Sequence, residues 1–274
     1  MSMSISGKTA IVTGSAHGIG LAVARHFVDK GANVVFADMD EAGLEAELGD
    51  EARGEGAIRK FGGDLCQKLT INNLLSFTID AFERVDILVN AARHMAVSDP
   101  LGVEDDAVEL LWRDNVLTSL RLSQMTARRM IQQAERSGEA GEGTIIGSII
   151  NLSSIAAHLT RPELLGYSVA SAAVDQMTRS MAVALAPKGI RVNAVAFGSV
   201  MSASLKATLK EQPGYRDVIT DGTPLHRIAA PAELAETVQF LASDASNFIT
   251  GQILTVDGGR SLIRWQFPRI DHSG

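Results

Sequence analysis

The stretch "KTAIVTGSAHGIG" (residues 8–20) joins a short apolar run to a glycine-rich turn, and the helical pattern "LAVARHFVDKG" follows it directly. Gly14, Gly18 and Gly20 punctuate the turn. Glycine lets the backbone bend sharply and approach a ligand closely, and the N-terminus of the following helix presents free N–H groups to an anion. The stretch therefore predicts a strand–turn–helix unit that binds the pyrophosphate of a dinucleotide, with an ordinary glycine-rich turn as the alternative.

An acidic residue, Asp38, ends the next apolar run about 20 residues further on, where a ribose-binding carboxylate is expected. This carboxylate accepts hydrogen bonds from the adenosine ribose and repels a 2′-phosphate, and no arginine stands beside it in the sequence. NAD is therefore favoured over NADP, unless Asp38 merely caps the next helix. Asp64 in "GGDL" either reaches the adenine edge or is a plain turn residue. The other contacts predicted for this half of the cofactor are Ser15, His17, Ile19 and Leu65.

Short runs rich in β-branched residues recur along the chain, with helix-like segments between them. They cover residues 8–14, 33–40, 57–65, 86–92, 144–154, 190–198 and 253–259. Most are apolar at every position, as parallel strands covered by helices on both faces should be. With 274 residues, we expect one domain, residues 1–274, with an α/β fold: a doubly wound, seven-stranded parallel sheet in three layers.

Three segments break this rhythm. The polar, glycine-rich stretch 132–144 predicts a surface extension between a long helix and the fifth strand. The stretch 199–224 has no strand pattern and a short helical part around Leu205, which predicts a mobile lid over a ligand site. The tail 260–274 carries Trp265 and Phe267, so we expect it to pack on its own subunit or on a neighbour.

The composition argues against several classes of protein. Net charge is −7 with acidic and basic residues interspersed, so no positive stripe is offered to nucleic acid. No apolar run approaches the roughly 20 residues of a membrane span. The N-terminal stretch has no signal-peptide pattern, so we expect a cytoplasmic protein. The single cysteine, Cys66, cannot form an internal disulfide, and no His, Cys, Asp and Glu cluster has the spacing of metal ligands.

Further motifs follow the cofactor turn in a fixed order, and together with it they resemble the short-chain dehydrogenase/reductase family, from Gly7 to about Gly259. They read "NAAR" (90–93), "WRDNV" (112–116), "NLSS" (151–154), "GYSVAS" (166–171), "VNAVAFG" (192–198) and "TVDGG" (255–259). The resemblance implies a Rossmann fold of about 250 residues and hydride transfer between a nicotinamide and a secondary alcohol or ketone.

The resemblance also implies site residues. Ser154 stands thirteen residues before Tyr167, the family's spacing, and would hydrogen-bond the substrate oxygen, with Ser153 as a structural neighbour. Tyr167 would exchange a proton with that oxygen, and Asn115 would hold a water chain to solvent. The implied contacts at the nicotinamide end are Asn90, Tyr167, Gly198 and Ser202, the last in place of the family's threonine.

The fourth member of the family's catalytic set is absent. The YxxxK motif reads Tyr167-Ser-Val-Ala-Ser171, so a neutral hydroxyl replaces a lysine. In the family that lysine hydrogen-bonds the nicotinamide ribose and, as a cation, lowers the pKa of the catalytic tyrosine. Ser171 could keep a hydrogen bond to the ribose but supplies no charge. Losing a tyrosine pKa shift of about 2–3 units would remove roughly 3–4 kcal/mol of stabilisation. This corresponds to a loss of about a hundred- to a thousand-fold in rate.

Arg93 is a second departure, because it stands where the family's NNAG motif has glycine. It follows the fourth strand, whose carboxyl end faces the same crevice as Tyr167 in a doubly wound sheet. One hypothesis is that its guanidinium supplies part of the missing positive charge. The alternative is that it projects into solvent or closes the pocket.

Two functions remain open at this point. One is an NAD-dependent oxidoreductase with an altered proton relay, acting on a secondary alcohol or ketone. The other is a catalytically silent dinucleotide-binding homologue, a sensor or partner subunit. His94 and His158 flank the predicted site, each as a loop histidine or, alternatively, as a proton carrier. The family that the chain resembles commonly builds dimers and tetramers from the helices around Asn115 and Tyr167 and from the last strand. These segments are apolar here, so the resemblance implies a homotetramer, with a dimer as second choice.

Overall fold

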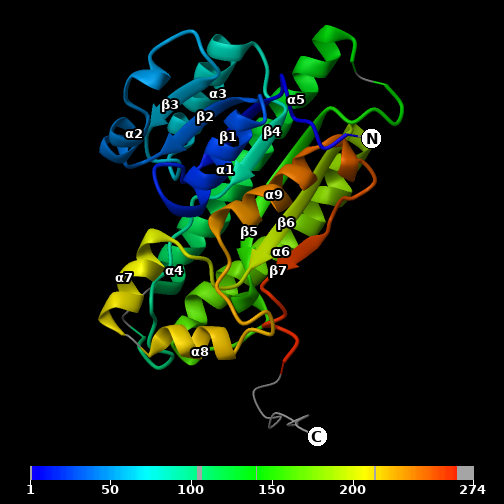
Figure 1. Ribbon diagram of the computed structural model, residues 1–274. Coiled ribbons are helices and arrows are strands. Elements are labelled where there is room, and N and C mark those ends of the chain that lie inside the picture. Colours follow the sequence, from blue (N-terminus) through cyan, green and yellow to red (C-terminus); the bar gives the residue numbers. More distant parts are fainter. Residues whose placement is uncertain (1, 104–106, 140, 213, 264–274) are drawn as a thin grey trace, which may run out of the picture.

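The computed structural model describes residues 2–103, 107–139, 141–212 and 214–263. Seven parallel strands form one sheet in the order β3-β2-β1-β4-β5-β6-β7 (Figure 1). The strands are β1 (Thr9–Thr13), β2 (Asn33–Asp38), β3 (Ile58–Gly62), β4 (Ile87–Asn90), β5 (Gly147–Ser154), β6 (Ile190–Phe197) and β7 (Ile253–Val256). Each lies within a run that the sequence pattern predicts, so the predicted seven-stranded sheet is confirmed.

The central strands are buried along their whole length, as their continuous apolar runs predict. Every residue of β1, β4, β5 and β6 is buried. Strand order reverses between β1 and β4, which are neighbours in the sheet but not in the sequence. A doubly wound sheet has its ligand crevice at this switch point, outside the carboxyl ends of the strands.

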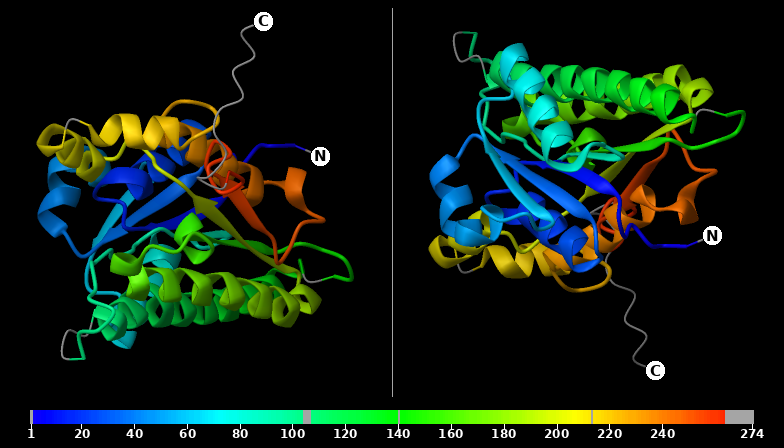
Figure 2. Two further views of the ribbon diagram at one scale, coloured as in Figure 1. Left: turned by 90° about the horizontal axis from the view of Figure 1, so that it is seen from below. Right: turned by 90° about the horizontal axis from the view of Figure 1, so that it is seen from above.

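Helices cover both faces of the sheet (Figure 2). They are α1 (Gly18–Asp29), α2 (Glu41–Leu48), α3 (Lys68–Phe82), α4 (Ala107–Leu111), α5 (Thr118–Ser137), α6 (Leu165–Leu185), α7 (Ala203–Glu211), α8 (Tyr215–Asp221) and α9 (Pro231–Ala242). The buried side chains of α1, α2 and α9 share one apolar cluster with one face of the sheet, and those of α3, α5 and α6 share a second cluster with the other. The result is the predicted three-layer architecture.

The segments between β5, β6 and β7 differ in part from the prediction. Helix α5 continues to Ser137 and ends where Gly138 takes a left-handed conformation, so 132–137 is helix and not a loop. The stretch 199–224 contains two helices, α7 and α8, which lie beyond the carboxyl ends of the strands near α4 (Figure 1). Trp265 and Phe267 lie outside the described residues.

No helix in the described part of the chain is long and apolar enough to span a membrane. The described residues also contain no group of three or more His, Cys, Asp or Glu side chains placed to hold a metal ion.

Candidate active site

The glycine turn after β1 fits a dinucleotide because two of its glycines leave no room for a side chain. A Cβ on Gly14 would lie 2.6 Å from Cα of Ala92, and one on Gly20 would lie 2.1 Å from the carbonyl oxygen of Gly14. Gly18 has φ +60° and open space beside it. His17, before the first turn of α1, caps no N–H with its side chain, so the turn and helix end together offer free donors to a pyrophosphate.

The neighbouring side chains of this turn face the protein. Ser15 is buried and its hydroxyl donates to the backbone oxygen of Ala37 at 3.4 Å. Ile19 packs against the apolar cluster of α1. Both therefore shape the turn, and a contact of Ser15 or Ile19 with a pyrophosphate would come from their backbone.

The carboxylate of Asp38 is held at the end of β2, beside the glycine turn. It accepts from the backbone N–H of Ala16 at 2.9 Å and from that of Asp40 at 3.0 Å. Asp40 lies within 2.6 Å of Nε2 of His17, and the backbone N–H of Gly43, followed by His17, holds the pKa of Asp40 below its usual value. Two carboxylates thus stand at and just after the end of β2, and among the described residues neither is paired with Lys or Arg.

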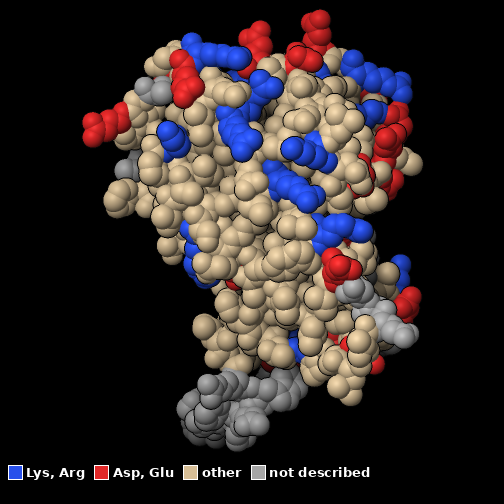
Figure 3. Space-filling model, turned by 180° about the vertical axis from the view of Figure 1, so that it is seen from behind, with Lys and Arg blue, Asp and Glu red and all other residues tan. Residues whose placement is uncertain are grey.

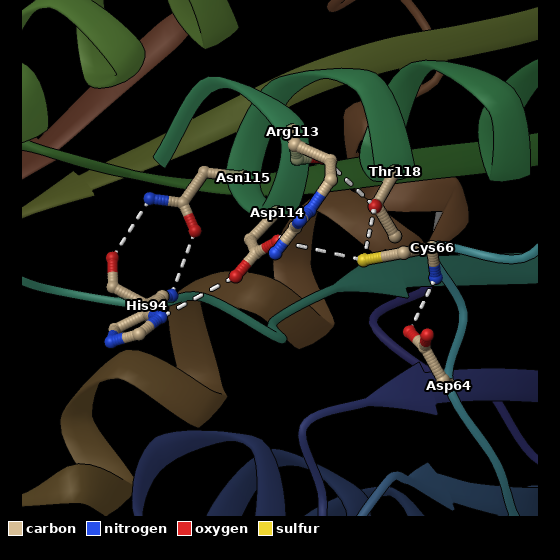
Figure 4. Close-up of polar contacts among 7 residues, drawn as sticks. All are labelled: Asp64, Cys66, His94, Arg113, Asp114, Asn115 and Thr118. Carbon is tan, nitrogen blue, oxygen red and sulfur yellow. Dashed lines mark hydrogen bonds and ion pairs between the residues drawn. The ribbon is translucent and has the colours of Figure 1, made fainter. Parts of the chain in front are cut away.

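Asp64 and Cys66 lie in the segment that follows β3 (Figure 4). The carboxylate of Asp64 accepts from the backbone N–H of Cys66 at 2.9 Å, which lowers the pKa of Asp64. Leu65, which stands between them in the sequence, is buried. Burial raises the pKa of the Cys66 thiol, and Thr118 donates to its sulfur at 3.3 Å. The thiol is therefore kept protonated, which does not suit a nucleophile.

Asn115 lies in η2 (Trp112–Leu117), a π-helical turn between α4 and α5. Its Nδ2 donates to the backbone oxygen of His94 at 2.8 Å, and its Oδ1 accepts from the backbone N–H of His94 at 2.7 Å (Figure 4). The imidazole of His94 lies 3.4 Å from Asp114. Asn115 thus clamps the loop that follows β4, while its predicted water-holding role stays a prediction. Single π turns are frequent at functional sites.

The remaining predicted side chains gather where β5 meets the start of α6. Ser154 ends β5, is 7% exposed, and its hydroxyl oxygen accepts from the N–H of Ala156 at 3.2 Å, which leaves its proton available. Tyr167 is 3% exposed and its hydroxyl has no hydrogen-bond partner in the structure. A buried phenol without a partner is costly. Its position therefore suits a substrate oxygen as the missing partner.

Ser171 is turned toward its own helix. Its hydroxyl donates to the backbone oxygen of Tyr167 at 2.8 Å, one turn earlier on α6. The hydrogen that was expected to reach a ribose is used here, so only the hydroxyl oxygen of Ser171 is left to face a ligand. A cavity of about 10 Å³ is lined by polar side chains, Tyr167, Ser171, Ser153, Asn115 and Arg93 among them, and by apolar ones such as Leu152 and Val174.

Arg93 does not project into solvent. Its Cζ lies 4.3 Å from the ring centroid of Phe197 and 5.2 Å from that of Tyr167, and Nη1 donates to the backbone oxygen of Ser153 at 2.9 Å. No carboxylate of the described residues pairs with this guanidinium. A free positive charge therefore lies on the face of the tyrosine ring.

Three residues expected at the nicotinamide end have structural partners. Nδ2 of Asn90 donates to Ser123 at 2.9 Å and to Asn151 at 2.8 Å, inside the protein. Gly198 follows β6 and packs against Asp257, where a Cβ would lie 3.0 Å from that of the aspartate. The hydroxyl of Ser202 accepts from Leu205 at 3.2 Å and caps α7. Their contact with a cofactor stays a prediction.

Sequence reasoning missed Asp175, a buried carboxylate on α6 two turns after Tyr167. The sequence signal for Asp175 was its spacing, because Tyr167, Ser171 and Asp175 follow one another at four-residue intervals and so share one face of the helix. The other side chains on that face are apolar or small. His158, which follows η3 (Ile155–Ala157), places Nε2 3.5 Å from its Oδ2.

The glycine turn follows β1, Ser154 ends β5 and Tyr167 lies in the first turn of α6. Comparison with known proteins agrees with this reading. Residues 14–261 match the family model described as enoyl-(acyl carrier protein) reductase. L-fucose dehydrogenase of Mus musculus is 34% identical over 94% of this chain and 89% of its own.

Two solved structures have the same fold. One is a gluconate 5-dehydrogenase from Burkholderia cenocepacia in complex with NADP and tartrate, with TM-score 0.83, 30% identity, and 96% of this chain and 98% of that one covered. The other is a 7α-hydroxysteroid dehydrogenase complexed with NADH and a 7-oxo bile acid, with TM-score 0.83, 30% identity, and coverages of 94% and 95%. The chain belongs to the short-chain dehydrogenase/reductase family and is an oxidoreductase by that membership.

Proposed function

We propose that the protein is an NAD(H)-dependent oxidoreductase that interconverts a secondary alcohol and a ketone in the cytoplasm. The observation that carries this proposal is the Tyr167 hydroxyl, which is buried and has no hydrogen-bond partner in the described part of the chain. A silent dinucleotide-binding protein would have no use for a phenol held in this state.

The chain's own residues account for substrate orientation and proton transfer. The Ser154 hydroxyl donates to the substrate oxygen and fixes it next to Tyr167, whose hydroxyl passes its proton to that oxygen during reduction and accepts one during oxidation. The bound nicotinamide supplies or accepts the hydride at the substrate carbon. The ring of Tyr167 belongs to the apolar cluster on this face of the sheet.

NAD is the cofactor that fits Asp38. Its carboxylate is fixed by two backbone N–H groups and stands beside a second carboxylate, Asp40. A 2′-phosphate brought to this place would meet negative charge, whereas ribose hydroxyls would find acceptors. The NADP and NADH complexes among the similar structures leave this choice open.

Arg93 takes over the electrostatic part of the missing lysine's role. Transfer of the Tyr167 proton leaves a phenolate, and the guanidinium on the ring face favours that anion. The hydrogen bond to Ser153 and the contact with Phe197 hold the guanidinium in place. The site is thus altered in layout, with a cation supplied from the loop after β4 in place of one on α6.

The decisive experiment has two steps. NADH binding is followed by its fluorescence, and turnover is then measured with a panel of secondary alcohols, sugars, sugar acids and their ketones. Binding with turnover of a panel member is the expected result. Binding without any turnover would favour the silent homologue, and absence of both would contradict the cofactor assignment.

We also propose that the protein assembles as a homotetramer, with a dimer as second choice. Apolar side chains are exposed along α6 and at the start of η2, namely Trp112, Leu165, Val169 and Val183. The face opposite to that of Figure 1 carries charges of both signs in its upper part and few in its lower half (Figure 3). Burial between subunits would remove this apolar surface from water.

A further inference from the structure

Ser171 and Tyr167 border a small cavity. Its volume of about 10 Å³ is about what one water needs, and Ser153 and Asn115 are among the other residues that line it. A water there would lie among groups able to donate and accept protons. A path for a proton from Tyr167 therefore has its first step inside this cavity.

Asp175 does not line the cavity itself, but it lies within reach of Ser153, which does. It stands one helical turn after Ser171 on the inward face of α6, is 2% exposed, and neither carboxylate oxygen receives a hydrogen bond. Burial raises the pKa of Asp175, while the Ser153 hydroxyl and the charges of His158 and Arg179 offset part of the rise. A carboxyl in this setting can hold a proton that a surface aspartate would release.

Ser153 connects Asp175 to the cavity. Its side chain lines the cavity and also lies within reach of the carboxyl, although its hydroxyl donates at 3.4 Å to the backbone oxygen of Ser171 in this structure. A hydroxyl rotates freely about its C–O bond and can donate and accept at the same time. Ser153 can therefore pass a proton between the carboxyl and a water in the cavity.

His158 connects Asp175 to solvent. Its Nε2 lies 3.5 Å from Oδ2 of Asp175, and its side chain is 60% exposed. Histidine changes its charge near neutral pH and is suited to carry a proton. The other cations near Asp175 are Arg179, one turn further along α6, and Arg93, which is bound to the backbone of Ser153. Neither can release a proton at neutral pH.

We propose that His158, Asp175 and Ser153 form the route by which the proton used by Tyr167 is exchanged with solvent. This inference rests on the proposed function. During reduction, Tyr167 gives its proton to the substrate oxygen and regains one from the cavity water. That water takes a proton from Ser153, Ser153 from the Asp175 carboxyl, and Asp175 from the His158 imidazolium, which is recharged by solvent. Oxidation runs the same chain in reverse.

The route follows from the substitution on α6. A lysine at position 171 would fill the cavity with a charged side chain, whereas Ser171 donates to its own helix and opens the way to the carboxyl one turn below. Asp175 and His158 are positioning and relay residues, since neither touches the reacting atoms.

The test compares Asp175→Asn and His158→Gln with the surface control Asp80→Asn, using full-length protein saturated with NADH. Asp175→Asn keeps the size of the side chain but has no ionisable proton to pass on, so kcat should fall about 10- to 100-fold, with NADH affinity and KM within about twofold. The kcat of His158→Gln should fall less than that of Asp175→Asn. Added imidazole should restore the activity of His158→Gln in proportion to the imidazole concentration. When kcat is measured against pH, the profile of each variant should lack the titration step that the profile of the parent shows.

Unchanged kcat in both relay variants would overturn the route. So would a loss of kcat that imidazole and formate fail to rescue and that comes with weakened NADH binding, because that pattern marks a structural defect. The control should match the parent throughout.

If the parent binds NADH but turns over no substrate, the proposed function is contradicted, but the proton route is not. A second measurement then tests the proton route. Infrared difference spectra between pH 5 and pH 8 should show the carbonyl stretch of a protonated carboxyl that is missing in Asp175→Asn. The same carboxyl band in parent and variant would show that Asp175 holds no exchangeable proton and would overturn the route.

Discussion

The guanidinium of Arg93 lies over the ring of Tyr167, with Cζ 5.2 Å from the ring centroid, although the two residues are 74 positions apart in the sequence. Arg93 comes from the loop after β4 and Tyr167 from the first turn of α6. The relationship puts a cation next to the tyrosine that we propose as the proton donor.

The first prediction concerns this cation. Arg93→Gln should lower kcat about 10- to 100-fold, equivalent to about 1.4–2.8 kcal/mol of transition-state stabilisation, because the phenolate loses its neighbouring charge. Arg93→Lys should retain part of the rate. Steady-state kinetics check both, with Arg128→Gln on the exposed side of α5 as the matched control. An Arg93→Gln variant as active as the parent would end the compensation hypothesis.

A second prediction restores the family's arrangement. Arg93→Gly combined with Ser171→Lys returns glycine to the loop and a cation to α6. The double variant should exceed Arg93→Gly in kcat by about tenfold or more, and its pH optimum should shift down, since a cation again stabilises the phenolate. Rates measured across the pH range show whether the single and double variants differ; equal rates would contradict the prediction.

The third prediction tests the cofactor turn. Gly14→Ala should weaken NADH binding at least tenfold and lower the free energy of unfolding by about 1–2 kcal/mol, because Gly14 has φ +65° and its Cβ would press on Ala92. Gly138→Ala carries similar strain at φ +71° in open space, so it should lose stability without losing NADH affinity. Fluorescence titration and thermal unfolding separate the two effects.

The fourth prediction concerns cofactor choice. The parent should bind NADH at least tenfold more tightly than NADPH, and Asp38→Asn should narrow that ratio because the repulsive charge is removed while the size is kept. Side-by-side calorimetric titrations measure both affinities. Equal affinities in the parent would show that Asp38 does not meet the ribose.

The fifth prediction is a pH dependence of stability. Burial raises the pKa of Asp175 above the ordinary value of 3.8, so the folded state holds this proton more tightly than the unfolded chain. The resulting stabilisation is complete below pH 3.8 and is lost as pH rises through the folded-state pKa. Asp175→Asn does not titrate, so its stability relative to the parent should increase with pH. Denaturant unfolding from pH 4 to 8 measures the difference; a difference independent of pH would contradict the raised pKa.

Local sequence patterns determined the sheet, the cofactor turn and the family. Strand β1, Gly14, Gly18 and Gly20 lie within a few residues of one another, and Asp38 follows at the end of β2, so their arrangement depends on short-range geometry. Burial of every residue in the central strands likewise follows from their unbroken apolar runs. The same kind of pattern failed at 132–137, where the polar composition that suggested a loop belongs to the exposed end of α5.

Only the tertiary structure decided how the altered site is built. The sequence raised the question of Arg93, but packing placed it against Phe197 and Tyr167, on two further elements. The inward turn of the Ser171 hydroxyl and the meeting of Asp175 with His158 were equally out of reach. Rotamers and contacts between distant segments depend on which side chains fill the space between the elements, and a linear pattern does not contain that information.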